Sequence, residues 1–285
     1  MTITKVGVVG CGTMGSGIAQ VCAQSGYEVI VCEGSDELLV RGLKSIEEFL
    51  NKGVERGKVS VAQKDLVLGR IIGTTNLNGF GDCDLVVEAT REDADEKKEV
   101  FGKLDKICPS HTILTSNTSS LSIIELASAT NRADKFAGLH FMNPAPLMKL
   151  VEIVTSIATS ETTIDACTQF AESLDKTVIV AKDIPGFIVN YLQYPFRLNA
   201  IRMLESGMAS REDIDAAATL GLGHPMGPLA LQDLVGLDVT YAGAMSVYRE
   251  TGDPNFFPPV LMKKMIQAGW LGRKTGKGFY DYDKK

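Results

Sequence analysis

Several hallmarks of common protein classes are missing from this chain of 285 residues. No run approaches the ~18 consecutive apolar residues that a membrane-spanning helix needs, so no membrane association is expected. The formal net charge of −6 offers no basis for general nucleic-acid binding. The six cysteines include no C-x-x-C pair and no zinc-like spacing, which favours reduced thiols, a cytoplasmic location and no bound metal. The first apolar run begins at Lys5, so no signal or transit peptide is expected.

The remaining composition, 45% hydrophobic and 22% charged, is that of a globular protein with a sizeable core. In the first two thirds, short apolar runs alternate with helical segments. Strands are expected at 5–9, 28–32, 71–74, 84–88, 112–115, 136–140, 149–154 and 176–180. Helices are expected at 13–25, 36–57, 93–107, 121–128 and 161–174. This alternation predicts an α/β fold with a doubly wound, mostly parallel sheet.

The first strand leads into Gly10-Cys11-Gly12-Thr13-Met14-Gly15, a G-x-G-x-x-G turn that opens the first helix. Gly10 permits a tight turn, Gly12 lets a pyrophosphate approach the backbone, and Gly15 lets helix and strand pack closely. Glu33 ends the next apolar run, where an acidic residue binds the ribose hydroxyls of a dinucleotide. Its negative charge favours NAD over NADP, because a 2′-phosphate would be repelled.

The sequence changes character at Asp183-Ile184-Pro185-Gly186, beyond which strands and helices no longer alternate. Helices are expected at 187–208, 211–220, 229–250 and 259–268. We therefore predict two domains, a Rossmann-type NAD-binding domain at 1–184 and an all-helical C-terminal domain at 185–285.

The chain has only three histidines. His111 lies in a polar turn and His224 in a turn rich in glycine and proline, so solvated or structural roles are expected for both. His140 ends an apolar run, which places it at the carboxyl end of a strand, where open α/β sheets bind ligands. By itself, a histidine in such a place is more often a satisfied core residue than a catalytic one.

Glu152 strengthens the catalytic interpretation of His140. It interrupts the apolar run 150–154, where a buried carboxylate needs a partner. A turn containing two prolines joins the two segments, so the side chains can meet. A carboxylate held against an imidazole stabilises the imidazolium form of a general base. A structural ion pair, or a Glu152 bonded to Lys149 or to the backbone, remains the alternative.

Two further polar segments admit both structural and functional interpretations. Residues 115–120, Thr-Ser-Asn-Thr-Ser-Ser, lie between a strand and a helix. Ser119 or Ser120 could cap that helix, or the cluster could supply donors to a nicotinamide and a substrate oxygen. Asn190, at the start of the first C-terminal helix, could begin that helix or bind substrate.

Six blocks in order along the chain carry a resemblance to a known family. They are GCGTMGSGIAQ from Gly10, SNTSSL from Ser116, AGLHFMNP from Ala137, DIPGFIVN from Asp183, GLGHPMGPLALQDLVGLD from Gly221, and GRKTGKGFYDY near the C-terminus. The whole chain resembles the short-chain L-3-hydroxyacyl-CoA dehydrogenases, in particular the bacterial 3-hydroxybutyryl-CoA dehydrogenases.

The resemblance assigns roles to individual residues. It implies catalytic roles for His140, Glu152, Ser119 and Asn190. It implies NAD contacts at Gly10, Cys11, Gly12, Thr13, Met14, Gly15, Glu33, Glu92, Lys97, Ser119, Asn143 and Lys274. Substrate contacts fall on Ser119, Asn143 and Asn190, with Lys52 and Arg56 of the basic helix 36–57 for the CoA phosphates. Where relatives carry a lysine and a serine in that helix, this chain has Arg56 and Phe49.

The resemblance further implies reversible oxidation of (S)-3-hydroxybutyryl-CoA to acetoacetyl-CoA, and a homodimer formed through the C-terminal domain. Two alternatives remain open from the residues alone. One is a related NAD(P)-dependent dehydrogenase of a free hydroxy acid or sugar acid. The other is a non-catalytic dinucleotide-binding protein.

Overall fold

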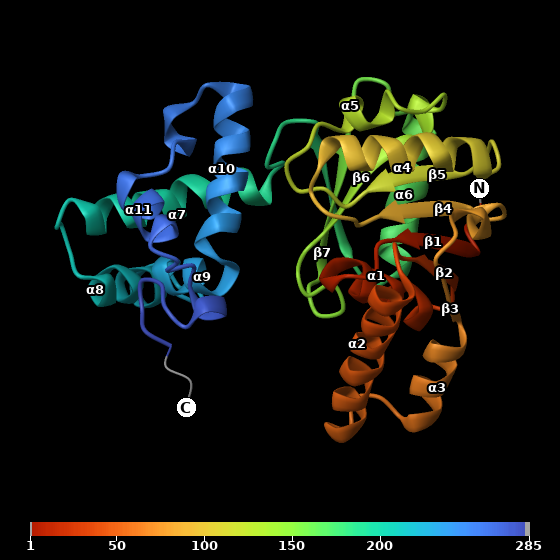
Figure 1. Cartoon of the computed structure of the whole chain (residues 1–285), viewed down its shortest axis with the longest axis horizontal. Coiled ribbons are helices and arrows are strands. Elements are labelled where there is room, and N and C mark those ends of the chain that lie inside the picture. The colour runs from red at the N-terminus through yellow and green to blue at the C-terminus, as the bar shows by residue number, and fades with distance from the viewer. Residues whose placement is uncertain (1, 283–285) are drawn as a thin grey trace. The chain divides into compact units, whose positions relative to one another are not determined.

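The computed structural model describes residues 2–282, and the chain divides between Ile184 and Pro185 into two compact units. The N-terminal unit contains a sheet flanked by helices, and the C-terminal unit is built of helices (Figure 1). No helix within the described residues is long and apolar enough to cross a membrane.

Eight strands of the N-terminal unit form one sheet in the order β3-β2-β1-β4-β5-β6-β7-β8. Their bounds are β1 (Lys5–Val9), β2 (Glu28–Cys32), β3 (Ile71–Thr74), β4 (Leu85–Glu88), β5 (Ile113–Ser116), β6 (Phe136–Phe141), β7 (Leu150–Thr155) and β8 (Thr177–Lys182). Neighbouring strands are parallel except β6 and β7, which are antiparallel. The predicted doubly wound, mostly parallel sheet is confirmed.

The strand order reverses between β1 and β4, because the chain first extends the sheet through β2 and β3 and then returns to add β4. In open α/β sheets, ligands bind beside the carboxyl ends of the strands at such a reversal. We call the edge at which β1, β2, β4, β5 and β6 end the carboxyl edge. The turn at Gly10–Gly15 and the loop after β4 both start from it.

The helices of this unit are α1 (Thr13–Gln24), α2 (Asp36–Glu55), α3 (Val61–Gly69), α4 (Ala94–Ile107), α5 (Ile123–Ala127) and α6 (Glu161–Ser173). Helix α3 is not among the helices that the sequence predicts. Its start is defined by a capping box, in which Ser60 and Gln63 each satisfy the other's backbone amide. Only Val67 of this helix is buried, so it lacks the apolar periodicity that reveals a helix in a sequence.

Helix α5 begins later than the sequence predicts, and the expected cap at Ser119 or Ser120 is wrong. Ser122 is the N-cap residue, and its hydroxyl accepts a hydrogen bond from the amide of Glu125. Asp183 completes the cap, because its carboxylate accepts hydrogen bonds from the Ser122 hydroxyl and from the amides of Ile123 and Ile124. The residue that follows β8 therefore fixes the start of α5, although it lies 61 positions from Ser122.

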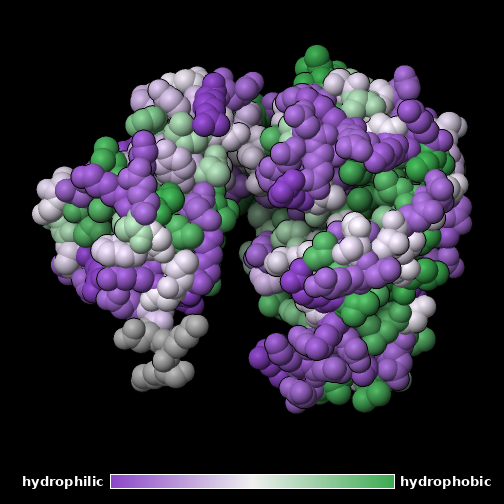
Figure 2. Space-filling view, viewed as in Figure 1, coloured by the Kyte–Doolittle hydropathy of each residue, from purple (hydrophilic) through white to green (hydrophobic). Residues whose placement is uncertain are grey.

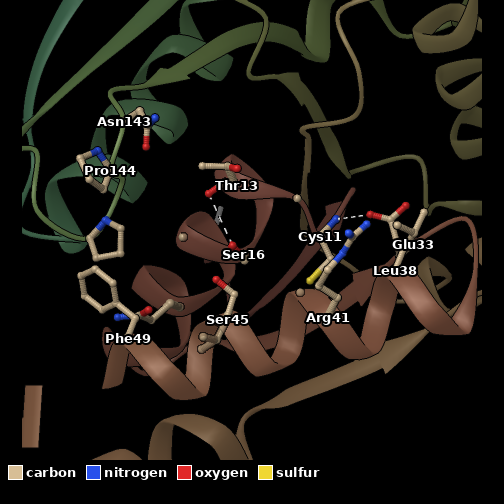
Figure 3. Close-up of a pocket in the computed structure, with 16 residues that line it drawn as sticks. Cys11, Thr13, Ser16, Glu33, Leu38, Arg41, Ser45, Phe49, Asn143 and Pro144 are labelled. Carbon is tan, nitrogen blue, oxygen red and sulfur yellow. Dashed lines mark hydrogen bonds between the residues drawn. The ribbon is translucent and has the colours of Figure 1, made fainter. Parts of the chain in front are cut away.

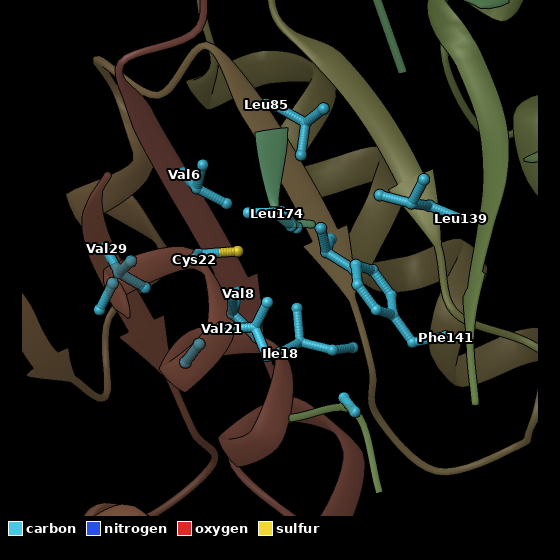
Figure 4. Packing of buried hydrophobic residues seen from close by; sticks show 14 of the residues in the cluster. Val6, Val8, Ile18, Val21, Cys22, Val29, Leu85, Leu139, Phe141 and Leu174 are labelled. Carbon is cyan, nitrogen blue, oxygen red and sulfur yellow. The ribbon is translucent and has the colours of Figure 1, made fainter. Parts of the chain in front are cut away.

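The core of the N-terminal unit packs α1 against β1 and its neighbours. Figure 4 shows Ile18 and Cys22 of α1 beside Val6 and Val8 of β1. All four side chains are completely buried. The central strands are apolar on both faces because helices cover both sides of the sheet, and this is why they appear as continuous apolar runs in the sequence.

The C-terminal unit contains α7 (Val189–Glu205), α8 (Arg211–Ala216), a π-helical turn (Ala217–Gly221), α9 (Pro228–Val235), α10 (Leu237–Thr251) and α11 (Val260–Gln267). The predicted single helix at 229–250 is wrong. Gly236, with φ of +102°, ends α9 and starts α10 in a new direction. Residues with a side chain rarely adopt this backbone conformation, so glycine permits the break.

Candidate active site

The turn between β1 and α1 leaves space where a dinucleotide needs it. Gly10 has φ of +93°, and a Cβ atom on Gly15 would lie 1.9 Å from the Gly10 carbonyl oxygen. Both positions therefore require glycine. A Cβ atom on Gly12 would meet nothing within 4 Å, so the backbone there borders open space. This arrangement fits a pyrophosphate that lies against the main chain at Gly12.

The first turn of α1 keeps its amide donors available. Its N-cap residue is Gly12, no side chain caps it, and no acidic residue lies in its first turn. The other helices of this unit each have a side-chain cap, supplied by Ser35, Ser60, Asp93, Ser122 and Ser160. Unpaired amides and the positive end of the helix dipole favour an anion. The start of α1 thus fits the phosphates of NAD.

Glu33 is held at the carboxyl edge by two backbone amides. Its Oε2 accepts a hydrogen bond from the amide of Cys11 (2.7 Å), and its Oε1 accepts one from Gly34 (2.7 Å). Each carboxylate oxygen retains acceptor capacity for a ribose hydroxyl. Burial raises the pKa of the Cys11 thiol to about 12, so the thiol stays protonated at neutral pH.

A pocket of about 600 Å³ lies beside this turn. Figure 3 shows Arg41, Ser45 and Phe49 on the face of α2 that borders the pocket, with Asn143 and Pro144 across from α2. Thr13 also lines it, whereas the partly buried Met14 packs against the hydrophobic core. The pocket therefore extends from Glu33 to the loop between β6 and β7.

His140 and Glu152 form a buried cross-strand pair. The antiparallel register of β6 and β7 sets them directly opposite each other, which puts both side chains on the same face of the sheet. The His140 Nδ1–H group donates to Glu152 Oε2 at 2.7 Å, with side chains 8% and 0% exposed. Lys149, the alternative partner from the sequence, pairs with Asp175 instead.

The loop that contains Ser119 is organised by Glu92. One carboxylate oxygen, Oε1, accepts hydrogen bonds from the Thr118 hydroxyl (2.6 Å), the Ser119 amide (3.0 Å) and the Ser120 hydroxyl (3.1 Å). Its other oxygen lies 3.6 Å from Lys97 Nζ. Glu92 therefore connects the loop after β4 to the loop after β5, and it places Ser119 at the carboxyl edge.

Lys97 lies beneath this loop, 1% exposed, and makes a second ion pair. Its Nζ donates to Glu88 Oε1 at 2.6 Å. Glu88 is fully buried at the end of β4 and also accepts hydrogen bonds from Thr90 and from the Ser116 hydroxyl. Lys97 therefore contacts the two carboxylates and has almost no exposed surface of its own.

Other residues singled out in the sequence belong to other elements of the chain. Lys52 and Arg56 are exposed at the end of α2, where the surface is mostly hydrophilic (Figure 2). Asn190 belongs to the first turn of α7 and Lys274 to the C-terminal segment, both in the other unit. Lys274 Nζ donates to both carboxylate oxygens of Asp238 (2.6 and 2.7 Å).

The structure also identifies residues that sequence reasoning missed. Glu88 is the last residue of β4, and Glu33 directly follows β2. A carboxylate at the end of an apolar strand is the sequence pattern that could have identified Glu88 as a site residue. Asn117 accepts a hydrogen bond from the Phe141 amide through its Oδ1 (2.8 Å), which joins the ends of β5 and β6 beside His140. No cluster of three or more histidine, cysteine or acidic side chains suited to a metal occurs within residues 2–282.

Comparison with known proteins gives full-length matches. Residues 5–184 match the model for the NAD-binding domain of 3-hydroxyacyl-CoA dehydrogenase, and residues 186–282 match that for its C-terminal domain. A probable 3-hydroxybutyryl-CoA dehydrogenase of Deinococcus radiodurans is 47% identical over 98% of this chain and 100% of its own length. A 3-hydroxybutyryl-CoA dehydrogenase of Clostridioides difficile is 44% identical, with the same two coverages. The crystal structure of (S)-3-hydroxybutyryl-CoA dehydrogenase from Ralstonia eutropha superposes with a TM-score of 0.96 at 42% identity, covering 99% of this chain and 100% of that one.

Replacement of Lys97 by Met leaves the buried Glu88 carboxylate without its cation. We expect Lys97→Met to lower the free energy of unfolding by about 3–5 kcal/mol, the typical result of breaking one side of a buried ion pair. The measurement is urea denaturation followed by circular dichroism. The double variant Lys97→Met/Glu88→Gln should recover part of the loss, because no unpaired charge then remains buried.

Lys103→Met on the same helix is the matched control. Lys103 Nζ donates to Glu99 at 2.7 Å, but both side chains are more than half exposed. The free energy of unfolding of this variant should therefore stay near that of the unchanged protein. A Lys97→Met variant as stable as this control would contradict the structural role of the Glu88–Lys97 pair.

Proposed function

Because this chain belongs to the 3-hydroxyacyl-CoA dehydrogenase family, we propose that it catalyses the reversible oxidation of (S)-3-hydroxybutyryl-CoA to acetoacetyl-CoA. NAD is its cofactor, which the glycine turn and Glu33 would hold and which would supply the hydride acceptor for C3 of the substrate. The observation that carries the proposal is the buried His140–Glu152 pair, on strands of the same sheet that carries the glycine turn. The relatives with 3-hydroxybutyryl-CoA dehydrogenase in their names supply the substrate class.

His140 is the proposed general base. Its Nδ1–H group is held by Glu152, so Nε2 is the ring nitrogen that takes the proton of the C3 hydroxyl as the carbonyl forms. Glu152 fixes the tautomer and orientation of the ring and stabilises the positive charge that the imidazole acquires. In the reverse direction the same nitrogen returns the proton to the carbonyl oxygen.

Polar side chains at the carboxyl edge orient the reacting groups in this proposal. At this edge, Ser119 and Asn143 contact both the cofactor and the substrate. Asn190, which belongs to the C-terminal unit, is proposed to hold a substrate oxygen. The backbone amide of Ser119 donates a hydrogen bond to Glu92, and Glu92 is in turn paired with Lys97. Both contacts support this placement of Ser119. Held in this way, the reacting atoms need little reorganisation before hydride transfer.

The CoA portion of the substrate is proposed to bind along α2. Arg41 and Phe49 line the pocket on this helix, and the exposed Lys52 and Arg56 follow within two turns. Guanidinium and ammonium groups are the usual partners of phosphates. Arg56 provides the bidentate donor, and Phe49 provides an apolar contact in place of a hydroxyl.

We also propose a homodimer formed through the C-terminal unit and a cytoplasmic location. Apolar side chains with more than two thirds of their surface exposed lie on the C-terminal unit at Leu192, Met208, Leu220 and Leu222, and such exposure supports an interface. All six cysteines are free and buried, which is compatible with a reducing compartment.

A comparison of substrates tests the proposed reaction. We expect NADH oxidation, followed by absorbance, with acetoacetyl-CoA and little or none with free acetoacetate. NADPH should be a poor substitute for NADH because Glu33 repels a 2′-phosphate. Equal or greater activity on the free acid would favour the alternative, a dehydrogenase of free hydroxy acids.

The variant His140→Gln tests the general base. It should lower kcat by about 10²–10⁴-fold, the usual contribution of general acid–base catalysis, while the Kd for NADH changes little. His111→Gln is the control, because His111 is an exposed residue that pairs with Asp84 and should leave kcat unchanged. Unaltered turnover of His140→Gln would remove His140 from the mechanism.

The variant Glu152→Gln keeps the shape of the side chain but removes its negative charge. The imidazolium form of His140 then loses its stabilising neighbour, so we expect a lower kcat and a pH–rate profile displaced to lower pH. Steady-state rates measured from pH 5 to pH 10 provide the check. A profile that coincides with that of the unchanged enzyme would leave Glu152 with a structural role only.

A further inference from the structure

Lys176 is a buried lysine without an obvious catalytic purpose. It precedes β8, and its side chain is 8% exposed. Its Nζ donates to two backbone carbonyl oxygens, those of Ala145 (2.7 Å) and Met148 (2.8 Å). The neighbouring Asp175 pairs with Lys149 instead. Burial and the charge of Lys149 both lower the pKa of Lys176, so its ammonium group occupies an unfavourable place.

Both carbonyl groups belong to the loop 142–149, which joins β6 to β7. This loop connects the strand of His140 to the strand of Glu152, and it carries Asn143. Within it, the amides of Leu147 and Met148 both donate to the Pro144 carbonyl oxygen, at 3.0 Å each, so the loop closes into a tight turn. Lys176 bonds the carbonyl groups at positions 145 and 148 of that turn.

The loop is also confined by α1. A Cβ atom on Gly17 would lie 3.1 Å from Pro146 Cδ and 3.3 Å from the Ala145 Cβ, so the helix and the loop already touch. Ala145 is 2% exposed, whereas Asn143, two residues earlier, is exposed and lines the pocket. The buried part of the loop is thus held by Lys176 and α1, and its exposed part presents Asn143.

We propose that Lys176 is a positioning residue for the active site, whose ammonium group fixes the loop 142–149 and thereby sets Asn143 in the pocket. This inference rests on the proposed function in one respect, the role of Asn143 in binding cofactor and substrate. Loss of the ammonium group leaves two carbonyl groups without this donor, which is unfavourable in a protein interior. The loop then relaxes and Asn143 loses its fixed place.

The comparison of Lys176→Met with Lys149→Met tests the proposal. Both replace a lysine near the base of the same loop, but Lys149 is exposed and pairs only with the exposed Asp175 among the ion pairs of the described residues. We expect Lys176→Met to lower kcat/KM for acetoacetyl-CoA and NADH by on the order of 10- to 100-fold, with a raised KM for both. Lys149→Met should behave like the unchanged enzyme.

Two further measurements separate positioning from stability. A role in stability alone would lower the fraction of folded enzyme but leave KM unchanged. Amide hydrogen exchange of the peptide covering 142–149 should be faster in Lys176→Met and unchanged in Lys149→Met. Lys176→Arg, which can still donate to both carbonyl groups, should have KM values for acetoacetyl-CoA and NADH close to those of the unchanged enzyme. If Lys176→Met does not fold, Lys176→Gln, whose shorter side chain cannot bond both carbonyl groups, takes its place.

Wild-type KM values together with unaltered exchange in Lys176→Met would overturn the proposal. Failure of the proposed function is a different result, namely absence of turnover by the unchanged protein with acetoacetyl-CoA. In that event the Kd for NADH, measured by fluorescence titration, and the hydrogen exchange still decide whether Lys176 fixes the loop. If Lys176→Met then has the same Kd for NADH and the same exchange rate as the unchanged protein, the positioning role of Lys176 is rejected.

Discussion

His140 and Glu152 face each other because β6 and β7 are antiparallel, and the candidate site depends on this antiparallel pairing. In an antiparallel pair, opposed residues share a face of the sheet, and a slip of one residue would put these two side chains on opposite faces. The other strands that end at the carboxyl edge are parallel and contribute the glycine turn, Glu33, Glu92 and Ser119. The loop 142–149, which connects the antiparallel strands β6 and β7, therefore also determines the register of the acid–base pair.

The parts of the molecule that could be predicted from the sequence have a local or strictly spaced signal. The turn at Gly10–Gly15 depends on which residues lack a side chain, and the central strands on continuous apolar runs. The pairing of His140 with Glu152 could be predicted because a carboxylate inside an apolar strand needs a partner. By contrast, α3 buries only Val67, and the break at Gly236 interrupts an apolar pattern that continues on both sides.

The remaining parts of the site depend on contacts between residues far apart in the chain. Lys97 is one of several charged residues in α4, and it is buried because its side chain lies between Glu88 at the end of β4 and Glu92 in the loop that follows. Lys176 bonds backbone carbonyl groups, which every residue has, so no sequence pattern reveals its partners. Buried charges of this kind contribute little net stability but are costly to disrupt, which suits residues that hold a loop in one arrangement.

The Asp183 carboxylate, which completes the cap of α5, has a mechanical consequence. The chain leaves the N-terminal unit at Ile184, one residue after a side chain that is tied to Ser122 and to two amides of α5. A pull transmitted along the backbone at this exit is shared between the N-cap residue of α5, three residues from Ser119, and the end of β7, where the Asp183 amide donates to the Thr155 carbonyl oxygen. Tension in the connecting peptide would thus act on the segment that carries Ser119 as well as on the sheet.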